Sequence, residues 1–121
     1  MQDSDNAVDG ILYIGLTVPF YSPVQRKKHF LKHGHTFGAM DEFHYEQMAD
    51  IFMSSPAHLN TFECVNPNGT HDRIRLDGVT RHFGVDFKMG IRTYHIRDAA
   101  GIARRGGPLG FVAHKCAEVH L

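Results

Sequence analysis

Hydrophobic residues recur at helical spacing in the first half of the chain. Between residues 41 and 52 they fall at i, i+3, i+4 and i+7, at Tyr45, Met48, Ala49 and Phe52. This is the pattern of a helix with one apolar face, and Asp41 and Glu42 suit its positive N-terminal end. Residues 24–33 also have helical character, and Gly34 is a plausible stop. The sequence therefore predicts two helices, over 24–33 and 41–52.

The hydrophobic period changes to two in the second half. Four short segments alternate in this way, at residues 60–65, 70–76, 80–87 and 91–97. Turn-forming sequences such as Asp77-Gly78 and Met89-Gly90 separate them, and connections this short imply an antiparallel meander.

These elements predict an α+β fold with N-terminal helices packed on one face of a four- to five-stranded antiparallel sheet. The fifth strand would be an edge strand within residues 111–119, after a glycine-rich basic loop that begins at Ala99. With 121 residues we expect a single domain, 1–121, whose core is 24–98 and whose extensions are 1–23 and 99–121.

An apolar segment near the start of the chain raises the question of a membrane. Residues 10–20 are about half the length needed to cross a bilayer, and acidic rather than basic residues precede them. We expect neither membrane insertion nor a signal peptide, and we expect residues 10–17 to form a short strand or a segment packed over the core.

The formal net charge is zero, which at first argues against a nucleic-acid partner. The charges are unevenly distributed, however. Residues 26–38 carry four bases and no acid, and residues 71–97 carry six bases against three acids. Two basic segments could therefore form an anion-binding face. The two cysteines, Cys64 and Cys116, exclude a cysteine-rich zinc site and leave open either a disulfide or two buried thiols.

Histidine is abundant, with ten in the chain, which favours either proton chemistry or metal binding. On a helix His29 and His33 share one face. At this spacing two imidazoles can bind one metal ion or supply a general base, or they can simply be solvated residues on a basic helix.

Strand alternation extends the candidate site. If Ile74 and Leu76 lie on the packed face, their neighbours project from the other face, and the same holds in the last strand if Tyr94 and Ile96 point inward. The sequence thus predicts one open sheet face without an acid, formed by His71, Arg73, Arg75, Thr93, His95 and Arg97.

Such a set suits cleavage of an RNA phosphodiester without a metal or any other cofactor. A base accepts the proton of the 2′-hydroxyl, a guanidinium holds the phosphate oxygens, and an acid protonates the departing 5′ oxygen. The product would be a 2′,3′-cyclic phosphate.

Four ordered motifs at these positions carry a family resemblance. They are HFLKHGHTFG at residues 29–38, EFHYEQMADIF at 42–52, RIRLDGVTRHFGV at 73–85 and GIRTYH at 90–95. The combination resembles the C-terminal ribonuclease domains of polymorphic bacterial toxins. These include contact-dependent inhibition effectors, in the broad group that joins barnase, EndoU, the tRNase colicins and RelE.

The resemblance implies a catalytic cluster of His29, His33, Arg75 and Thr93, with Gly34, Phe37 and Gly38 completing its first motif. His95 is an additional histidine beside this pattern, and we include it among the catalytic candidates. The candidates for substrate binding are Lys32, His35, Arg73, Tyr94 and Arg97.

The resemblance also implies partners and a location. The substrate would be RNA, often tRNA in this family, and a cognate immunity protein would cover the site. The domain would be delivered as the C-terminal part of a secreted or cell-surface effector and would act in the cytoplasm of the target cell. Residues 2–20 and the 26 residues after His95 have no counterpart in the family pattern.

Two other functions remain open at this point. A metal-dependent hydrolase could use the HxxxH histidines, although no Glu follows the first His and no third ligand has a persuasive position. A non-catalytic RNA-binding module could keep the same fold. An ADP-ribosyltransferase is disfavoured, since no catalytic Glu motif occurs in the predicted sheet.

Overall fold

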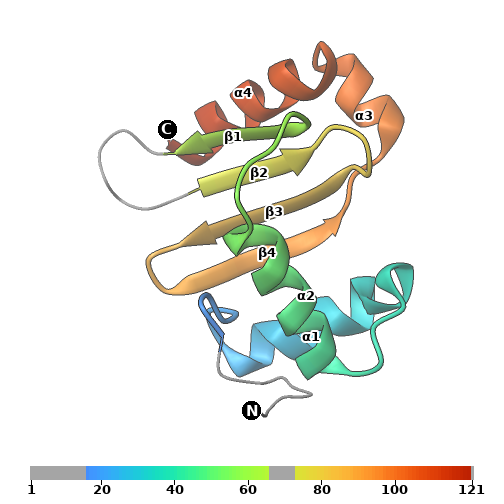
Figure 1. Ribbon diagram of the computed structural model, residues 1–121, viewed down its shortest axis with the longest axis vertical. Helices are drawn as coiled ribbons and strands as arrows, with labels where there is room; N and C mark the ends of the chain where they lie inside the picture. Colours follow the sequence, from blue (N-terminus) through green and yellow to red (C-terminus); the bar gives the residue numbers. More distant parts are fainter. Residues whose placement is uncertain (1–15, 66–72, 121) are drawn as a thin grey trace.

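The computed structural model describes residues 16–65 and 73–120, and it has the α+β architecture that the sequence predicts (Figure 1). The first part holds helix α1 (Pro23–His33), a 3₁₀ turn η1 (Gly34–Phe37) and helix α2 (Glu42–Ser54). The strands are β1 (Thr61–Val65), β2 (Arg73–Asp77), β3 (His82–Phe87) and β4 (Gly90–Ile96). Two further helices follow, α3 (Ala99–Arg104) and α4 (Gly107–His120).

Side-chain caps set the ends of the first two helices. Ser22 accepts a hydrogen bond from the backbone N–H of Gln25, and Pro23 occupies the first turn, where its missing N–H costs nothing. Asp41 caps α2 in the same way through the N–H of His44 at 2.8 Å. At Gly34 a Cβ atom would lie 2.4 Å from the ring of Phe30, so the turn after α1 needs glycine. Both predicted helices are confirmed, with ends shifted by at most two residues.

The four strands form an antiparallel meander in the order β1-β2-β3-β4. In its register Arg75 lies opposite Gly84, and Gly84 lies opposite Tyr94. The next row joins Ile74, Val85 and Thr93 in the same way. Side chains within a row share a face of the sheet, because alternation runs in phase across paired strands.

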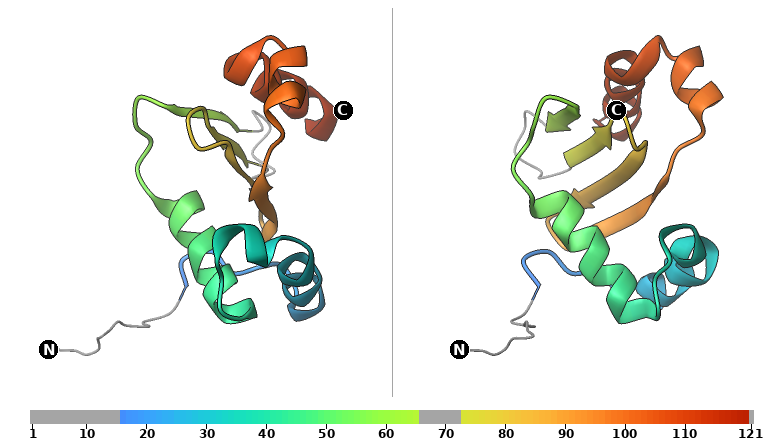
Figure 2. Two further views of the ribbon diagram at one scale, coloured as in Figure 1. Left: turned by 90° about the vertical axis from the view of Figure 1, so that its right-hand side faces the viewer. Right: turned by 45° about the vertical axis from the view of Figure 1, so that its right-hand side comes forward.

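Helices cover both faces of this sheet. Helix α2 crosses one face, whereas α3 and α4 lie against the other, and α1 lies beyond the β4 edge (Figures 1 and 2). The core is accordingly divided in two. The α2 side buries Phe20, Tyr45, Ala49, Met53, Ile91 and Tyr94. The α3–α4 side buries Ile74, Leu76, Phe83, Val85, Ile102, Phe111 and Val112.

The segment before α1 is attached to the edge of β4. Phe20 forms a parallel bridge with Ile91, whose backbone N–H donates to the carbonyl of Pro19 at 2.7 Å. A Cβ at Gly90 would lie 2.4 Å from that carbonyl oxygen, and Gly90 has a φ of 130°. The turn at the start of β4 therefore requires glycine. The strand or packed segment expected at residues 10–17 lies almost wholly outside the described residues.

Buried carboxylates of α2 hold the same segment from the other side. Asp50 accepts a hydrogen bond from the N–H of Val18 at 2.7 Å, and Glu46 accepts one from Phe20 at 2.9 Å. Glu46 also lies 3.6 Å from the guanidinium of Arg26 in α1. These contacts fix α1 relative to both α2 and β4.

The C-terminal part differs from the sequence-based expectation. Residues after Ala99 form α3 and α4 in place of a basic loop and a fifth strand. Phe111, Val112 and Cys116 meet the sheet from one side of a helix. Gly106, in the turn between the two helices, and Gly107, the first residue of α4, each have a φ of 90°. No helix in the described ranges is long and apolar enough to cross a membrane.

A disulfide joins Cys64 of β1 to Cys116 of α4, with their Cα atoms 6.1 Å apart. Of the two possibilities that the sequence left open, the structure contains the disulfide. The bond fastens the C-terminal helix to the edge strand of the sheet and borders the core on the α3–α4 side.

Removal of this bond should lower the stability of the protein. The Cys64→Ala/Cys116→Ala variant is expected to lose about 2–4 kcal/mol of unfolding free energy, because the unfolded chain is freed from a loop of 52 residues. Urea unfolding followed by circular dichroism measures the loss. Dithiothreitol should destabilise the wild type but leave the double variant unchanged. Equal stability of the oxidised wild type and the double variant would contradict the expectation.

Candidate functional site

Helix α1 and strand β4 bring three histidines together at the edge of the sheet. The rings of His33 and His95 are nearly parallel, at 22°, with centroids 4.8 Å apart. The ring of His29, one turn earlier on α1, lies 6.0 Å from that of His33. With Thr93 and Arg97 these residues form what we call the histidine site.

The hydrogen bonds of His95 determine its protonation. Its Nε2 lies 3.2 Å from a guanidinium nitrogen of Arg97, and its Nδ1 lies 3.0 Å from the hydroxyl of Thr93. A guanidinium can only donate, so Nε2 must be the unprotonated acceptor. We therefore assign the proton to Nδ1, where it is donated to Thr93, and His95 is neutral.

Arg97 is presented to the site without a counter-ion. Its guanidinium lies 5.4 Å from the centre of the Phe83 ring and 4.9 Å from that of Phe111. Within the described part of the chain no Asp or Glu pairs with it. An arginine held on aromatic rings with no carboxylate partner is well prepared to bind an anion.

The electrostatic environment keeps all three imidazoles neutral at pH 7. Burial, reinforced by His33, Arg97, His29 and Lys32, lowers the pKa of His95 from 6.5 to about 4. Burial also lowers the pKa of His33, with further contributions from His29, Lys32 and His35. Neutral imidazoles can accept protons, which is the first requirement of a general base.

The pKa of His29 is lowered as well, by burial first and then by Lys32 and Lys28. The Nδ1 atom of His29 is buried and has no hydrogen-bond partner in the described structure. The ring of His33 makes no hydrogen bond to any described residue either. His33 is thus the imidazole most available to a ligand.

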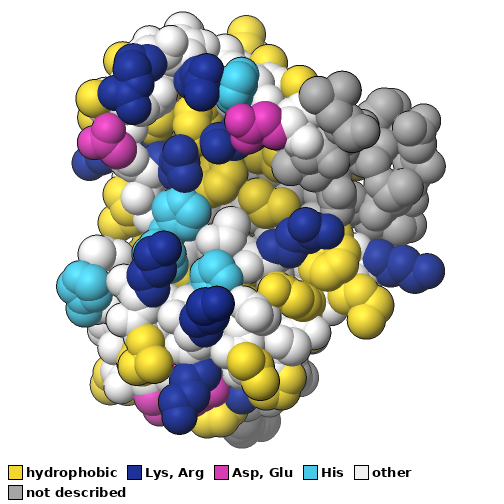
Figure 3. Space-filling model, turned by 180° about the vertical axis from the view of Figure 1, so that it is seen from behind, with side chains coloured by type: hydrophobic (Ala, Val, Ile, Leu, Met, Phe, Trp, Pro, Cys, Tyr) yellow, Lys and Arg dark blue, Asp and Glu magenta, His cyan; other side chains and the backbone are white. Residues whose placement is uncertain are grey.

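Basic side chains surround the histidine site. Lys32 and His35, both predicted to bind substrate, are exposed and close enough to influence the histidines electrostatically. Figure 3 shows histidine and Lys or Arg side chains side by side across the middle of this face. An anionic ligand would meet mostly positive charge here.

Arg75, predicted to be catalytic, does not lie in the histidine site. It projects from the opposite face of the sheet, is 5% exposed, and makes an ion pair with Glu63. Its guanidinium also donates to the backbone carbonyls of Phe52 and Ser55, at 2.8 and 2.6 Å. Arg75 fastens the C-terminal end of α2 to the sheet.

The other predicted residues of β2 and β4 also divide between the faces. Arg73 lies on the α2 side and pairs with Asp86 at 2.7 Å. Tyr94 is buried there, with its ring stacked 4.3 Å from that of Phe37. His71 lies outside the described residues.

The expectation of one open sheet face was therefore wrong. It assumed that the apolar residues of β2 and β4 point to the same side of the sheet. Because helices cover both faces, Ile74 is buried toward α4 while Tyr94 is buried toward α2. Thr93, His95 and Arg97 consequently share a face with Ile74 and not with Arg75.

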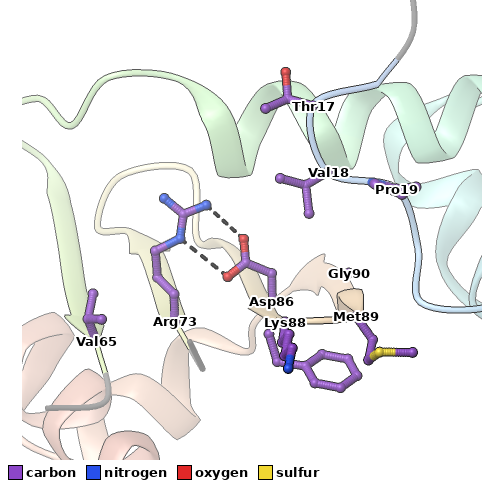
Figure 4. Close-up of a pocket in the computed structure, with 10 residues that line it drawn as sticks. Thr17, Val18, Pro19, Val65, Arg73, Asp86, Lys88, Met89 and Gly90 are labelled. Atoms are coloured by element: carbon purple, nitrogen blue, oxygen red, sulfur yellow. Dashed lines mark hydrogen bonds and ion pairs between the residues drawn. The ribbon is translucent and has the colours of Figure 1, made fainter. Parts of the chain in front are cut away.

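A shallow pocket of about 690 Å³ opens on the α2 side, beside the turn between β3 and β4 (Figure 4). Arg73 and Asp86 lie in its wall and bond to each other. Glu63 lies 3.7 Å from the same guanidinium. The guanidinium of Arg73 is thus neutralised by the carboxylates beside it, unlike that of Arg97.

Sequence reasoning missed the two aromatic rings that support Arg97. Phe83 belongs to β3, and Phe111 belongs to α4, where an edge strand was expected within residues 111–119. Only a helical interpretation of residues 107–120 could have pointed to the role of Phe111. Even that interpretation would not have placed Phe111 beside β4.

The described side chains do not form a metal-binding cluster. Within residues 16–65 and 73–120 no group of three His, Cys, Asp or Glu side chains is arranged to hold a metal ion. His29 and His33 share a helix face as predicted, but their neighbours are another imidazole, a hydroxyl and a guanidinium.

Comparison with known proteins gave no further guide: no model of a protein family matches the chain, and no significant match was found among curated proteins.

The lowered pKa of His95 should make the protein less stable in mild acid. The unfolded chain protonates this histidine near pH 6.5 and the folded chain only near pH 4, so the unfolded state binds more protons between these values. The free energy of unfolding should therefore fall as the pH falls from 6.5 to 4. His95→Gln should reduce this slope in urea unfolding at a series of pH values, whereas the exposed His35→Gln variant should keep most of it. An unchanged slope in His95→Gln would contradict this assignment.

The position of Arg75 predicts a structural role. Arg75→Met should cost about 2–4 kcal/mol of unfolding free energy, because it leaves two carbonyls and a carboxylate without their donor. Urea unfolding measures the loss. Arg104→Met, which alters an exposed arginine of α3, serves as the control and should change stability little. An Arg75→Met variant as stable as this control would show that the contacts contribute nothing.

Proposed function

We propose that this protein is a metal-independent endoribonuclease of the bacterial toxin type, which cleaves RNA by attack of the 2′-hydroxyl. One observation carries the proposal: neutral imidazoles from α1 and β4 meet an arginine that has no counter-ion among the described residues. This set contains the proton acceptor and the phosphate ligand that the reaction needs, and it uses no cofactor.

In the proposed reaction His33 accepts the proton of the 2′-hydroxyl as its oxygen bonds to phosphorus. Arg97, with Lys32 nearby, neutralises the charge that develops on the phosphate oxygens. The bond from phosphorus to the 5′ oxygen breaks, and a protonated imidazole gives its proton to that oxygen. The products are a 2′,3′-cyclic phosphate and a free 5′-hydroxyl.

The toxin assignment rests on the resemblance of the four motifs, and the α+β fold is compatible with it. Within this proposal His29, His33, Thr93 and His95 belong to one site. The resemblance places Arg75 in the catalytic cluster; we propose Arg97 as the phosphate ligand instead, because Arg75 is buried on the other face. We further propose tRNA as the RNA, a cognate immunity protein as the inhibitor, and the cytoplasm of a target cell as the place of action after delivery within a larger effector.

Loss of single side chains should identify the chemistry. His33→Ala is expected to reduce cleavage about 10²–10⁴-fold, since it removes the base, and Arg97→Ala about 10²–10³-fold, since it removes charge stabilisation. Purified protein and variants are incubated with labelled tRNA in excess EDTA, and the cyclic phosphate is detected by mass spectrometry. His58→Ala, an exposed histidine outside the site, should cleave like the wild type.

Several results would contradict the proposal. Cleavage that stops in EDTA would favour a metal-dependent hydrolase. Tight RNA binding without cyclic-phosphate ends would indicate a non-catalytic RNA-binding module. Wild-type cleavage by His33→Ala would remove His33 from the mechanism. Sequencing of RNA ends after brief expression in cells would identify the target and the position of the cut.

A further inference from the structure

The second proton transfer of the proposed reaction needs a donor, and the contacts of His95 restrict when it can act. Thr93 occupies Nδ1 and Arg97 occupies Nε2, so neither nitrogen is free to take up a proton or to meet a substrate. His95 could serve as an acid only if one of these contacts opened.

We propose that Arg97 controls His95: a phosphate group draws the guanidinium away from Nε2, and the freed nitrogen takes up a proton and becomes the general acid. This inference rests on the proposed ribonuclease function. It names His95 as the acid and Arg97 as both the phosphate ligand and the residue that keeps His95 neutral until a phosphate arrives.

The relative strengths of the contacts favour this exchange. The contact between Arg97 and His95 is a single hydrogen bond of 3.2 Å to a neutral acceptor. A phosphate offers two anionic oxygens to the planar guanidinium, and such charge-assisted pairs are roughly twice as strong as neutral hydrogen bonds. Thr93 can stay in place, because Nδ1 donates to its hydroxyl whether the ring is neutral or charged.

The charges around His95 act in the same direction. The charged and titratable groups that act on it are His29, His33 and Lys32 from α1 and Arg97, the residue after β4. Each of these disfavours a proton on His95, and burial disfavours it further. A bound phosphate brings negative charge that offsets Arg97 and Lys32, so protonation becomes easier only while the ligand is present.

The proton balance of the reaction then closes. On phosphate binding Nε2 of His95 takes one proton from solvent. During cleavage His33 gains the proton of the 2′-hydroxyl, and His95 gives its proton to the 5′ oxygen as the bond to phosphorus breaks. When the cyclic phosphate leaves, His33 returns its proton to solvent and Arg97 returns to Nε2.

Histidine ¹⁵N NMR tests the proposal without RNA cleavage. The probes are inorganic phosphate and a short single-stranded DNA, which has the phosphodiester but no 2′-hydroxyl to attack. In the free protein at pH 7 we expect His95 to carry its proton on Nδ1 alone. Either probe should raise the pKa of His95 by about 1–3 units from its value near 4. If only the DNA acts, the site selects a phosphodiester over free phosphate.

Arginine variants separate this control from a general charge effect. In Arg97→Met the pKa of free His95 should rise, since one cation is lost, and the further rise with DNA should largely disappear. Arg97→Lys keeps the charge but not the paired donors, and it should restore only part of the ligand-induced rise. Arg104→Met, the exposed control on α3, should behave like the wild type.

The outcomes are distinct from those of the cleavage assay. The proposal is overturned by a proton on Nε2 in the free protein, by the absence of binding or of any pKa change with both probes, or by a full ligand-induced rise in Arg97→Met. If RNA is cleaved but the pKa of His95 does not rise with the probes, the ribonuclease proposal stands, and only the proposed effect of Arg97 on His95 is refuted. If the pKa of His95 rises with the probes but no RNA is cleaved, the ribonuclease proposal is refuted, and the protein has an anion-dependent switch at His95.

Discussion

The antiparallel register of β2, β3 and β4 determines which side chains can share a site in this protein. Rows of paired residues run across the three strands, so Arg75, Gly84 and Tyr94 face α2, while Ile74, Val85 and Thr93 face the other side. A shift of one residue between β3 and β4 would turn Thr93, His95 and Arg97 toward α2 and bury them among its aromatic side chains. The histidine site exists only in the observed register.

The site also depends on how α1 is held at the edge of β4. None of the residues of α1 is fully buried. Its position is set instead by the segment before it, which bridges to Ile91 and is bound by the carboxylates of Glu46 and Asp50. These two acids are buried on α2 and accept hydrogen bonds from backbone N–H groups. Neither is among the groups that shift the pKa of His29, His33 or His95.

Much of the fold could be predicted from the sequence, because the helix around Ala49 and the four strands each carry their own periodicity and turn residues. The sequence also predicted, from helical spacing, that His29 and His33 share one face of a helix. Arg75 was misplaced for a different reason. Alternation shows which residues of one strand share a face, but when helices cover both faces of the sheet it does not show toward which face an apolar residue is buried. The C-terminal helices were missed because glycines at 106 and 107 suggested a loop, whereas Gly106 lies in the short turn between α3 and α4 and Gly107 begins α4.

The C-terminal helices are nevertheless part of the functional argument. Phe111 of α4 lies beneath the guanidinium of Arg97, and the same ring packs against Phe83 at 5.6 Å. Helix α4 is in turn joined by the disulfide to β1, which is the edge strand opposite to β4. An arginine just after an edge strand would otherwise be free to turn toward solvent or toward Asp98, the next residue. Stacking on a fixed aromatic surface restricts it to the side where His95 lies, which is why the structure can hold a guanidinium against a neutral imidazole with no carboxylate between them.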